Sequence, residues 1–400
     1  MLKGKHITLV ISGGIAAYKA PLLLRRLLKA GAEVRVAVTP SALDFVSEKT
    51  LAVLSGYPVL GGKDPYPDPV GHIALADWTD LLLVVPATAN TLAKRAQGLA
   101  DNEATSLLLA YAGSVLWAPA MNEKMWIQAP TQENVQALEA EGHTVLLPAY
   151  GFLAEGYAGR GRLPALEAIF WAVKAQLVLA EFSKPYPLAG KKVVVSAGGT
   201  VEALDPVRAI TNHSSGKMGL ALATVASLLG AQVTFVAAGE ARRLPVLPQI
   251  EVDRVTDARE LAAAMVKHSA EADIVVMAAA VSDYRPQTSA PQKIKKEKGQ
   301  GLSLDLVENP DILQSLPHGG QLFLVGFAAE TEQVLKYARD KFQRKGVDLL
   351  VANDVSQAGL GFQSERNAAY LVTADGEVAL PPQDKVALAG QIFLKILASQ

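Results

Sequence analysis

Residues able to bind a phosphorylated ligand follow an apolar run in the second half of the chain. The run from Val193 leads into Gly198 and Gly199, where the backbone must turn, and Gly216-Lys217 opens a helical pattern. A strand, a glycine-rich turn and a helix N-terminus form an anion site, because free backbone N–H groups and the helix dipole face the turn. The spacing matches neither GxGxxG nor GxxxxGK[ST]. The pattern alone therefore predicts either a nucleotide- or phosphate-binding domain or a structural turn with a long polar loop.

The first half of the chain repeats this arrangement. A strand over 6–11 runs into Ser12-Gly13-Gly14, and a helix over 15–29 and a strand over 33–38 follow. Two such βαβ units predict an α/β protein with two tandem, Rossmann-like, doubly wound domains. We expect domains over 1–183 and 191–400, joined by a proline- and glycine-containing linker over 184–190. Further strands are predicted near 81–85, 114–118, 144–147, 274–279, 322–326, 349–352 and 368–373.

Composition narrows the classes of function. The chain has 400 residues, a net charge of −1 and no cysteine. Near-zero charge argues against nucleic acid or an anionic membrane as the main partner. No apolar run approaches the roughly 18 residues of a transmembrane helix, and the N-terminus passes directly into a strand, so we expect a cytoplasmic protein. Without cysteine, disulfides, thiolate metal sites and a thiol nucleophile are excluded.

Polar residues of the first domain should gather where its strands end. Thr88 and Asn90 follow one predicted strand, and Met121 and Asn122 follow the next. Parallel strands present their carboxyl ends at one edge of the sheet, which is where α/β domains bind ligands. Thr88 and Asn122 are also suited to capping helices. A lone histidine such as His72 is more often structural than catalytic.

Taken together, these strings resemble the flavin-dependent decarboxylases that act on cysteine-derived carboxylates. SGGIAAYK, PATANTLAKxAxGxADN, PAMNxxMW and GxLAxGxxGxGRL occur in the family's order. The resemblance implies bound FMN, phosphopantothenoylcysteine as substrate, and a homo-oligomer with its FMN site at a subunit boundary. It makes His72 the catalytic histidine and Asn122 the residue that holds the substrate carboxylate. The cofactor contacts it implies are Ser12, Gly13, Gly14, Thr88, Asn90 and Met121.

The chemistry suits these assignments. A β-thiol acid cannot simply lose CO2, because the resulting carbanion has no electron sink until flavin oxidises the carbon that bears sulfur. One position departs from the family, which usually has cysteine as the final proton donor where this chain has Glu155. Glu155 either replaces that donor, with a pKa raised by burial, or is inert while another acid serves.

Strings of the second domain resemble the phosphopantothenate–cysteine ligase half of bacterial bifunctional coenzyme A biosynthesis proteins. They are DPVRxIxNxSSGKMG, AAAVSDYRP, APQKIKK, ENPDIL, GFAAET and VANDVSxxxxGFxSxxN. The resemblance implies CTP as co-substrate, Mg²⁺ or Mn²⁺, and an acyl cytidylate that cysteine opens. It implies that Asn212 binds this intermediate and that Lys293 closes over the phosphates. The alternative for Lys293 is that it belongs to a basic loop that is merely solvated. The remaining nucleotide contacts it implies are Gly198, Gly199, Ala279, Ala280, Asp283, Asn309, Pro310, Asp311, Ile312, Phe327, Lys341 and Lys345.

The two halves together predict consecutive steps toward 4′-phosphopantetheine. A nicotinamide dehydrogenase with two Rossmann units would need a GxGxxG turn and an acidic residue about 20 positions later. Neither glycine-rich turn has that spacing. A flavin-binding regulatory subunit with impaired decarboxylase activity is the other alternative, and only the missing cysteine supports it.

Overall fold

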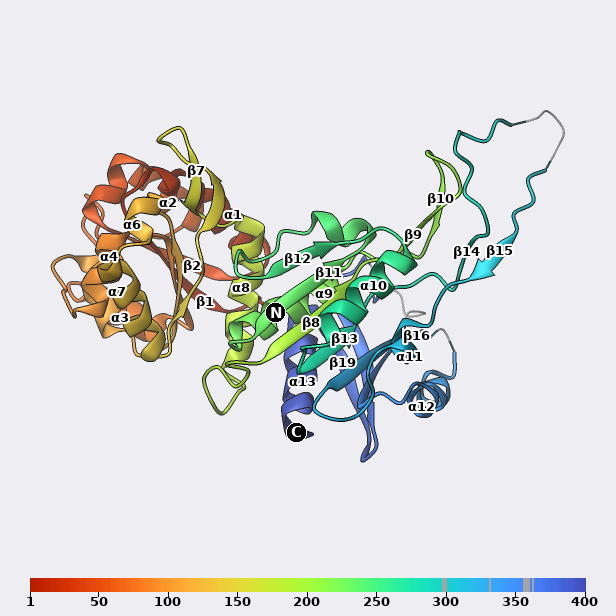
Figure 1. The fold of residues 1–400 in the computed structure, drawn as a ribbon. Helices are drawn as coiled ribbons and strands as arrows, with labels where there is room; N and C mark the ends of the chain where they lie inside the picture. The colour runs from red at the N-terminus through yellow and green to blue at the C-terminus, as the bar shows by residue number, and fades with distance from the viewer. Residues whose placement is uncertain (297–300, 331, 355–359, 362) are drawn as a thin grey trace. The chain divides into compact units, whose positions relative to one another are not determined.

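The computed structural model describes residues 1–296, 301–330, 332–354, 360, 361 and 363–400. The chain forms two compact units. The first comprises Met1–Leu177 with Leu247–Gln249, and the second comprises Val178–Val246 with Ile250–Gln400. The predicted α/β class with parallel, doubly wound sheets is confirmed (Figure 1). In the described part of the chain, no helix has both the length and the apolar character needed to cross a membrane.

The first unit is built on a parallel five-stranded sheet in the order β2-β1-β3-β4-β5. Its central strand β3 is buried along its whole length, as expected for a parallel strand covered on both faces. The strands are β1 (His6–Ile11), β2 (Glu33–Val38), β3 (Leu81–Ala87), β4 (Val115–Pro119) and β5 (Thr144–Val145).

Helices cover this sheet, and one hairpin stands beside it. The single helix predicted over 15–29 is divided, because a 3₁₀ turn precedes an α-helix that starts beside Pro21. Proline lacks an N–H and favours the first turn of a helix. The helices are η1 (Ile15–Lys19), α1 (Ala20–Lys29), η2 (Pro40–Asp44), α2 (Glu48–Ser55), α3 (Gly71–Trp78), α4 (Ala89–Ala96), α5 (Glu103–Ala110), α6 (Glu123–Trp126), α7 (Ala129–Ala140) and α8 (Leu166–Leu179), and the hairpin is β6 (Ala149–Phe152) with β7 (Ala158–Arg162).

The second unit is built on an eight-stranded sheet in the order β12-β11-β8-β13-β16-β17-β18-β19. The first six strands are parallel, and β18 and β19 are antiparallel additions at one edge. The strands are β8 (Lys192–Ala197), β11 (Gln232–Ala237), β12 (Glu251–Arg254), β13 (Ile274–Met277), β16 (Phe323–Glu330), β17 (Leu349–Asp354), β18 (Arg366–Thr373) and β19 (Gly376–Asp384).

Two segments expected to be loops contain short hairpins. The polar insert after Thr200 forms β9 (Val201–Ala203) and β10 (Ala209–Thr211), which pair antiparallel. The basic stretch from Asp283 begins with β14 (Tyr284–Pro286), which pairs with β15 (Leu306–Glu308), while its residues 297–300 lie outside the described part. The helices of this unit are α9 (Lys217–Leu228), η3 (Gly239–Arg243), α10 (Ala258–Ser269), α11 (Ile312–Ser315), α12 (Val334–Lys345) and α13 (Lys385–Ala398).

The segment 184–190, predicted as a linker, lies within the second unit and contacts the rest of it through its backbone and side chains. Leu188 is fully buried, and its N–H donates to the carbonyl of Leu229 at 3.0 Å. Gly190 and Gly230 adopt positive φ angles of 77° and 94°, which glycine tolerates best.

Candidate active sites

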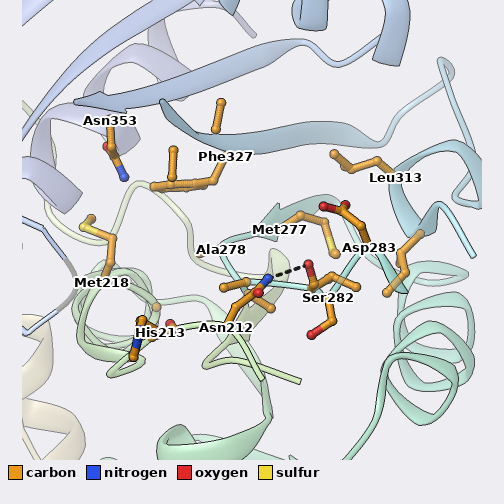
Figure 2. Close-up of a pocket in the computed structure, with 18 of the residues that line it drawn as sticks. Asn212, His213, Met218, Met277, Ala278, Ser282, Asp283, Leu313, Phe327 and Asn353 are labelled. Atoms are coloured by element: carbon orange, nitrogen blue, oxygen red, sulfur yellow. Dashed lines mark hydrogen bonds between the residues drawn. The ribbon is translucent and has the colours of Figure 1, made fainter. Parts of the chain in front are cut away.

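A cavity of about 920 Å³ opens at the carboxyl ends of the parallel strands of the second unit. Segments that follow β8 and β13, together with the end of β16 itself, supply most of its walls, as expected for an open α/β sheet. Figure 2 shows their side chains converging on the cavity. Predicted site residues that line it are Asn212, Ala279, Ala280, Asp283, Asn309, Pro310, Asp311, Ile312, Phe327, Lys341 and Lys345.

Gly198 and Gly199 do not line this cavity, but other segments of the chain approach both of them closely. Gly198 has a φ of 87°, and a Cβ there would lie 2.0 Å from the carbonyl oxygen of Ala238. A Cβ on Gly199 would lie 2.4 Å from the carbonyl oxygen of Asn212. Gly199 thus lets the chain around Asn212 approach the end of β8, and Gly198 does the same for the chain at Ala238. The amide of Asn212 then donates to the carbonyl of Val281 at 2.9 Å, the dashed contact in Figure 2.

The start of α9 provides an electropositive wall. Gly216 precedes the helix with a φ of 71°, and its neighbours Ser214 to Gly219 line the cavity. Unpaired N–H groups and the helix dipole at such an end favour a bound anion. Lys217 reaches across to the β17–β18 segment, where its Nζ lies 2.6 Å from the Glu365 carboxylate and 3.1 Å from the Gln363 carbonyl.

Basic residues of α12 form the opposite wall. Lys341, Arg344 and Lys345 line the cavity, and Lys345 is paired with Asp311. Lys341 donates to the carbonyl of Phe327 at 3.2 Å. Burial lowers the pKa of Lys341, the carboxylate of Glu330 opposes that shift, and the cations of Lys345 and Arg344 add to it. A partly desolvated cation here is poised to gain from an anionic ligand.

Lys293 lies away from this cavity in the structure. Its side chain is exposed, and the segment that carries it is fastened at the next residue, Ile294. The buried carboxylate of Asp205 accepts from the Ile294 N–H at 3.1 Å, and Arg208 donates to the Ile294 carbonyl at 2.9 Å. Burial opposes ionisation of Asp205, but N–H donors of Val207, Ile294 and Arg208 hold its pKa below the ordinary value.

In the first unit, the hydroxyl of Ser12 links the turn after β1 to the end of β3 by hydrogen bonds. Ser12 is fully buried, donates to the Pro86 carbonyl at 2.7 Å and accepts from the Thr88 N–H at 2.9 Å. Thr88 in turn caps α4 by accepting from the Thr91 N–H at 3.3 Å, so the capping role foreseen for it is present. Asn90 is exposed in the first turn of α4.

Asn122 ties the end of β4 to the β6–β7 hairpin. Its Oδ1 accepts from the Lys124 N–H, which caps α6, and from the Tyr157 hydroxyl, both at 2.9 Å. The Met121 N–H donates to the Gly161 carbonyl at 3.0 Å, and a Cβ on Gly161 would lie 2.1 Å from the Met121 carbonyl. Because Oδ1 is used twice, the Nδ2 group of Asn122 is the part suited to a substrate carboxylate.

His72 and Glu155 stand apart from that cluster within one chain. His72, at the start of α3, has its Nδ1 3.2 Å from a carboxylate oxygen of Glu103 on α5. Glu155 is exposed in the turn between β6 and β7. Among the described residues, no hydrogen bond or ion pair links either side chain to Asn122.

Comparisons with known proteins agree with the division into two units. Residues 1–178 match the family described as Flavoprotein, and residues 188–399 match that described as DNA/pantothenate metabolism flavoprotein C-terminal domain. The chain is 45% identical over 400 residues to the coenzyme A biosynthesis bifunctional protein CoaBC of Vibrio cholerae, with 98% of each chain covered. The chain belongs to this bifunctional family.

Another CoaBC protein is similar over nearly the whole chain, and a solved domain structure is similar over part of it. The Escherichia coli K12 protein is 43% identical over 403 residues, covering 98% of this chain and 96% of its own. A solved structure of the C-terminal domain of CoaBC is 33% identical and covers 52% of this chain and 95% of that one, with a TM-score of 0.45. Membership of the CoaBC family confirms the resemblance seen in both halves and decides against the dehydrogenase alternative.

Several cavity residues were not assigned from the sequence. Lys217 lies inside a matching string, so that string was the available signal. Asn353 and Asn367, on β17 and β18, likewise lie inside a matching string. Lys385, at the start of α13, lies outside all of these strings, and only the tertiary structure places it at the cavity.

Proposed function

We propose that this CoaBC family member ligates 4′-phosphopantothenate with cysteine in its second unit, using CTP, and decarboxylates the product in its first unit, using FMN. The observation that carries this proposal is the cavity of the second unit. It gathers residues from five separate strings of the sequence around one space of about 920 Å³, between a helix N-terminus and a cluster of cations.

The walls of that cavity suit activation of a carboxylate by a nucleoside triphosphate. A carboxylate is a poor electrophile until it carries a phosphate leaving group, and negative charge gathers at phosphorus in the transition state. The N–H groups at the start of α9 and the Lys341 ammonium would stabilise that charge. Asn212, held by Val281, would orient the acyl cytidylate for attack by the amine of cysteine.

The divalent metal would be held chiefly by the nucleotide. Magnesium usually binds through one or two carboxylates together with substrate phosphates, and it keeps several waters. Asp283 lines the cavity together with the carboxylates of Glu308 and Asp311. Its backbone carbonyl accepts from the Asn309 N–H at 2.8 Å, so it lies next to the nucleotide-binding turn. Within the described ranges, no group of three or more histidine, aspartate or glutamate side chains gathers to bind an ion unaided.

The first unit offers a fit for FMN at the carboxyl edge of its sheet. The Gly13 backbone comes so close to Ser41 that a Cβ would lie 2.2 Å from its Oγ, and the N-terminus of α4 faces the same edge. Gly13, Gly14, Thr88, Asn90 and Met121 would hold the cofactor, with Ser12 fixing the two turns. Bound flavin would supply the hydride acceptor and donor that this decarboxylation requires.

The residues of this unit would then handle protons and the carboxylate. His72, oriented by Glu103, would take the thiol proton. Asn122 Nδ2 would donate to the substrate carboxylate without adding a positive charge that would resist CO2 loss. Glu155 would return the final proton from the β6–β7 turn.

A homo-oligomer would bring these separated groups together. Ile15, Tyr18 and Leu22 are 64%, 56% and 58% exposed on η1 and α1, next to the Ser12–Gly14 turn. An apolar patch of this kind beside a site is typical of an interaction surface. We expect a second copy to cover it and to complete the flavin site. A cytoplasmic location stays a prediction from composition.

The test is to supply phosphopantothenate, cysteine, CTP and Mg²⁺ to the purified protein and to follow products by mass spectrometry. We expect 4′-phosphopantetheine and pyrophosphate to accumulate only when CTP is present. Supplied phosphopantothenoylcysteine should be decarboxylated without CTP. If it is not, the regulatory-subunit alternative for the first unit gains support; a failure to release pyrophosphate would refute the ligase assignment.

A further inference from the structure

Two residues that line the cavity of the second unit each carry a buried polar atom that lacks a hydrogen-bond partner in the part of the chain that the structure describes. These atoms are the hydroxyl of Ser282 and the Oδ1 of Asn353. Buried polar atoms in native proteins are nearly always paired, because an unpaired one forfeits its hydrogen bonds to water. An unpaired atom beside a ligand cavity is therefore explained when the ligand provides its partner.

Asn353 lies beside the aromatic ring expected to contact the nucleotide base. In the parallel ladder of β16 and β17, Phe327 pairs with Val351 and Ala329 pairs with Asn353. Side chains two residues apart on a strand project from the same face, so Phe327 and Asn353 stand on one face of neighbouring strands. Figure 2 shows both side chains at the same end of the cavity.

The neighbouring polar groups at this end already have protein partners. Asn367 on β18 accepts through its Oδ1 from the Ala368 N–H at 3.0 Å. Lys385, at the start of α13, donates to the carbonyl of Gly361 at 3.0 Å. Asn353 thus differs from Asn367 in having an amide oxygen that is left for a ligand.

An aromatic ring and a side-chain amide provide two different kinds of base recognition. Stacking on a ring holds any base, because every base has a π-face. A hydrogen bond to the base edge distinguishes one base from another. Cytosine presents an exocyclic amino group, which is a donor, where uracil presents a carbonyl oxygen, which is an acceptor. An amide oxygen facing that position therefore favours cytosine.

We propose that Asn353 is a specificity-determining residue for the nucleotide, and that its Oδ1 accepts a hydrogen bond from the exocyclic amino group of cytosine while Phe327 stacks on the ring. This inference rests on the proposed CTP-dependent ligation. Uracil would place its carbonyl oxygen against Oδ1, and two acceptors repel each other. Sites built to hydrogen-bond one group reject analogues that lack it, because the buried partner is then left unpaired.

The experiment compares CTP with UTP in both binding and turnover on the full-length protein. Calorimetry gives the dissociation constant of each nucleotide, and pyrophosphate release in the presence of phosphopantothenate gives kcat/KM. The variants are Asn353→Ala, which removes the amide, and Asn353→Asp, which keeps acceptor oxygens only. Ser282→Ala is the matched control, because it removes the other unpaired atom of the same cavity.

We expect Asn353→Ala to lower kcat/KM and affinity for CTP by roughly ten- to a hundredfold and those for UTP by less than about threefold. The CTP preference should collapse in this variant, whereas Asn353→Asp should keep it at lower affinity. Ser282→Ala should change both nucleotides by the same factor. If Asn353→Ala fails to fold, Asn353→Asp still tests the assignment of Asn353. Loss of the CTP preference in Asn353→Asp would overturn that assignment.

Two results separate this inference from the proposed function. A wild-type protein that binds CTP in preference to UTP but releases no pyrophosphate would refute the ligation and leave the Asn353 assignment standing on calorimetry. A wild-type preference for CTP that Asn353→Ala preserves would overturn the assignment of Asn353 and leave the ligase function intact.

Discussion

Asp205 gives the sharpest test of how the second unit holds its basic segment. Its two carboxylate oxygens have separate tasks. Oδ1 accepts from the N–H groups of Val207 and Arg208, at 2.7 and 2.8 Å, and so shapes the turn between β9 and β10. Oδ2 accepts from the Ile294 N–H at 3.1 Å and from the Arg208 guanidinium at 3.2 Å, and so fastens the segment that carries Lys293.

Asp205→Asn separates these tasks. The amide can keep an oxygen toward Val207 and Arg208, but its NH2 group then faces the Ile294 N–H and the guanidinium, which are both donors. A hydrogen bond to a charged acceptor typically shifts an equilibrium constant by at least about tenfold. Only the bond from the Ile294 N–H joins Asp205 to the segment, because the Arg208 guanidinium belongs to the same β9–β10 turn as Asp205. We expect the attached state of the segment to fall by roughly tenfold relative to the detached state.

Hydrogen exchange and ligase kinetics together measure this change. The Ile294 amide should exchange roughly tenfold faster in Asp205→Asn. We expect kcat/KM for pyrophosphate release to fall by up to about tenfold, because the attachment to Asp205 sets the position from which Lys293 would move to the phosphates. Decarboxylation should be unaffected. Asp257→Asn is the control, since Asp257 caps α10 through its Oδ1 and makes no contact with this segment among the described hydrogen bonds. Unchanged Ile294 exchange, or ligase activity equal to that of the control, would refute the reasoning.

Further predictions concern single side chains. Lys293→Gln should abolish ligation and spare decarboxylation of supplied phosphopantothenoylcysteine, whereas His72→Asn should do the reverse; equal loss of both activities in either variant would contradict separate sites. Burial lowers the pKa of Lys341 below the 10.5 of an ordinary lysine. As the pH rises, Lys341 should therefore lose its charge earlier than an ordinary lysine, and CTP affinity should fall with it. Lys341→Arg should remove this loss of affinity at alkaline pH, measured as the pH dependence of KM for CTP. If the pH dependence is unchanged in this variant, another group causes the loss. Glu155→Gln should still release CO2 but accumulate the unreduced enethiol product with reduced flavin; normal product at a normal rate, read by mass spectrometry and absorbance, would show Glu155 to be inert.

The prediction of the fold succeeded where the signal is local. Apolar runs that lead into glycine predicted β1 and β8, and β1 and β2 have the predicted bounds. The hairpins after Thr200 and Asp283 were missed because their strands have three residues each and no alternating apolar face. Periodicity needs a longer run than that to distinguish a strand from a loop.

The sequence by itself determined the α/β class, the family and eleven of the residues that line the cavity of the second unit. Those residues follow strand ends, and in a parallel sheet strand ends share one edge. The tertiary structure alone decided which residues from distant segments meet there. Asp205 reaches Ile294 across 89 positions, and Asn353 joins Phe327 only because β17 lies next to β16. Such contacts depend on the order of strands in the sheet, which local patterns of side chains do not encode.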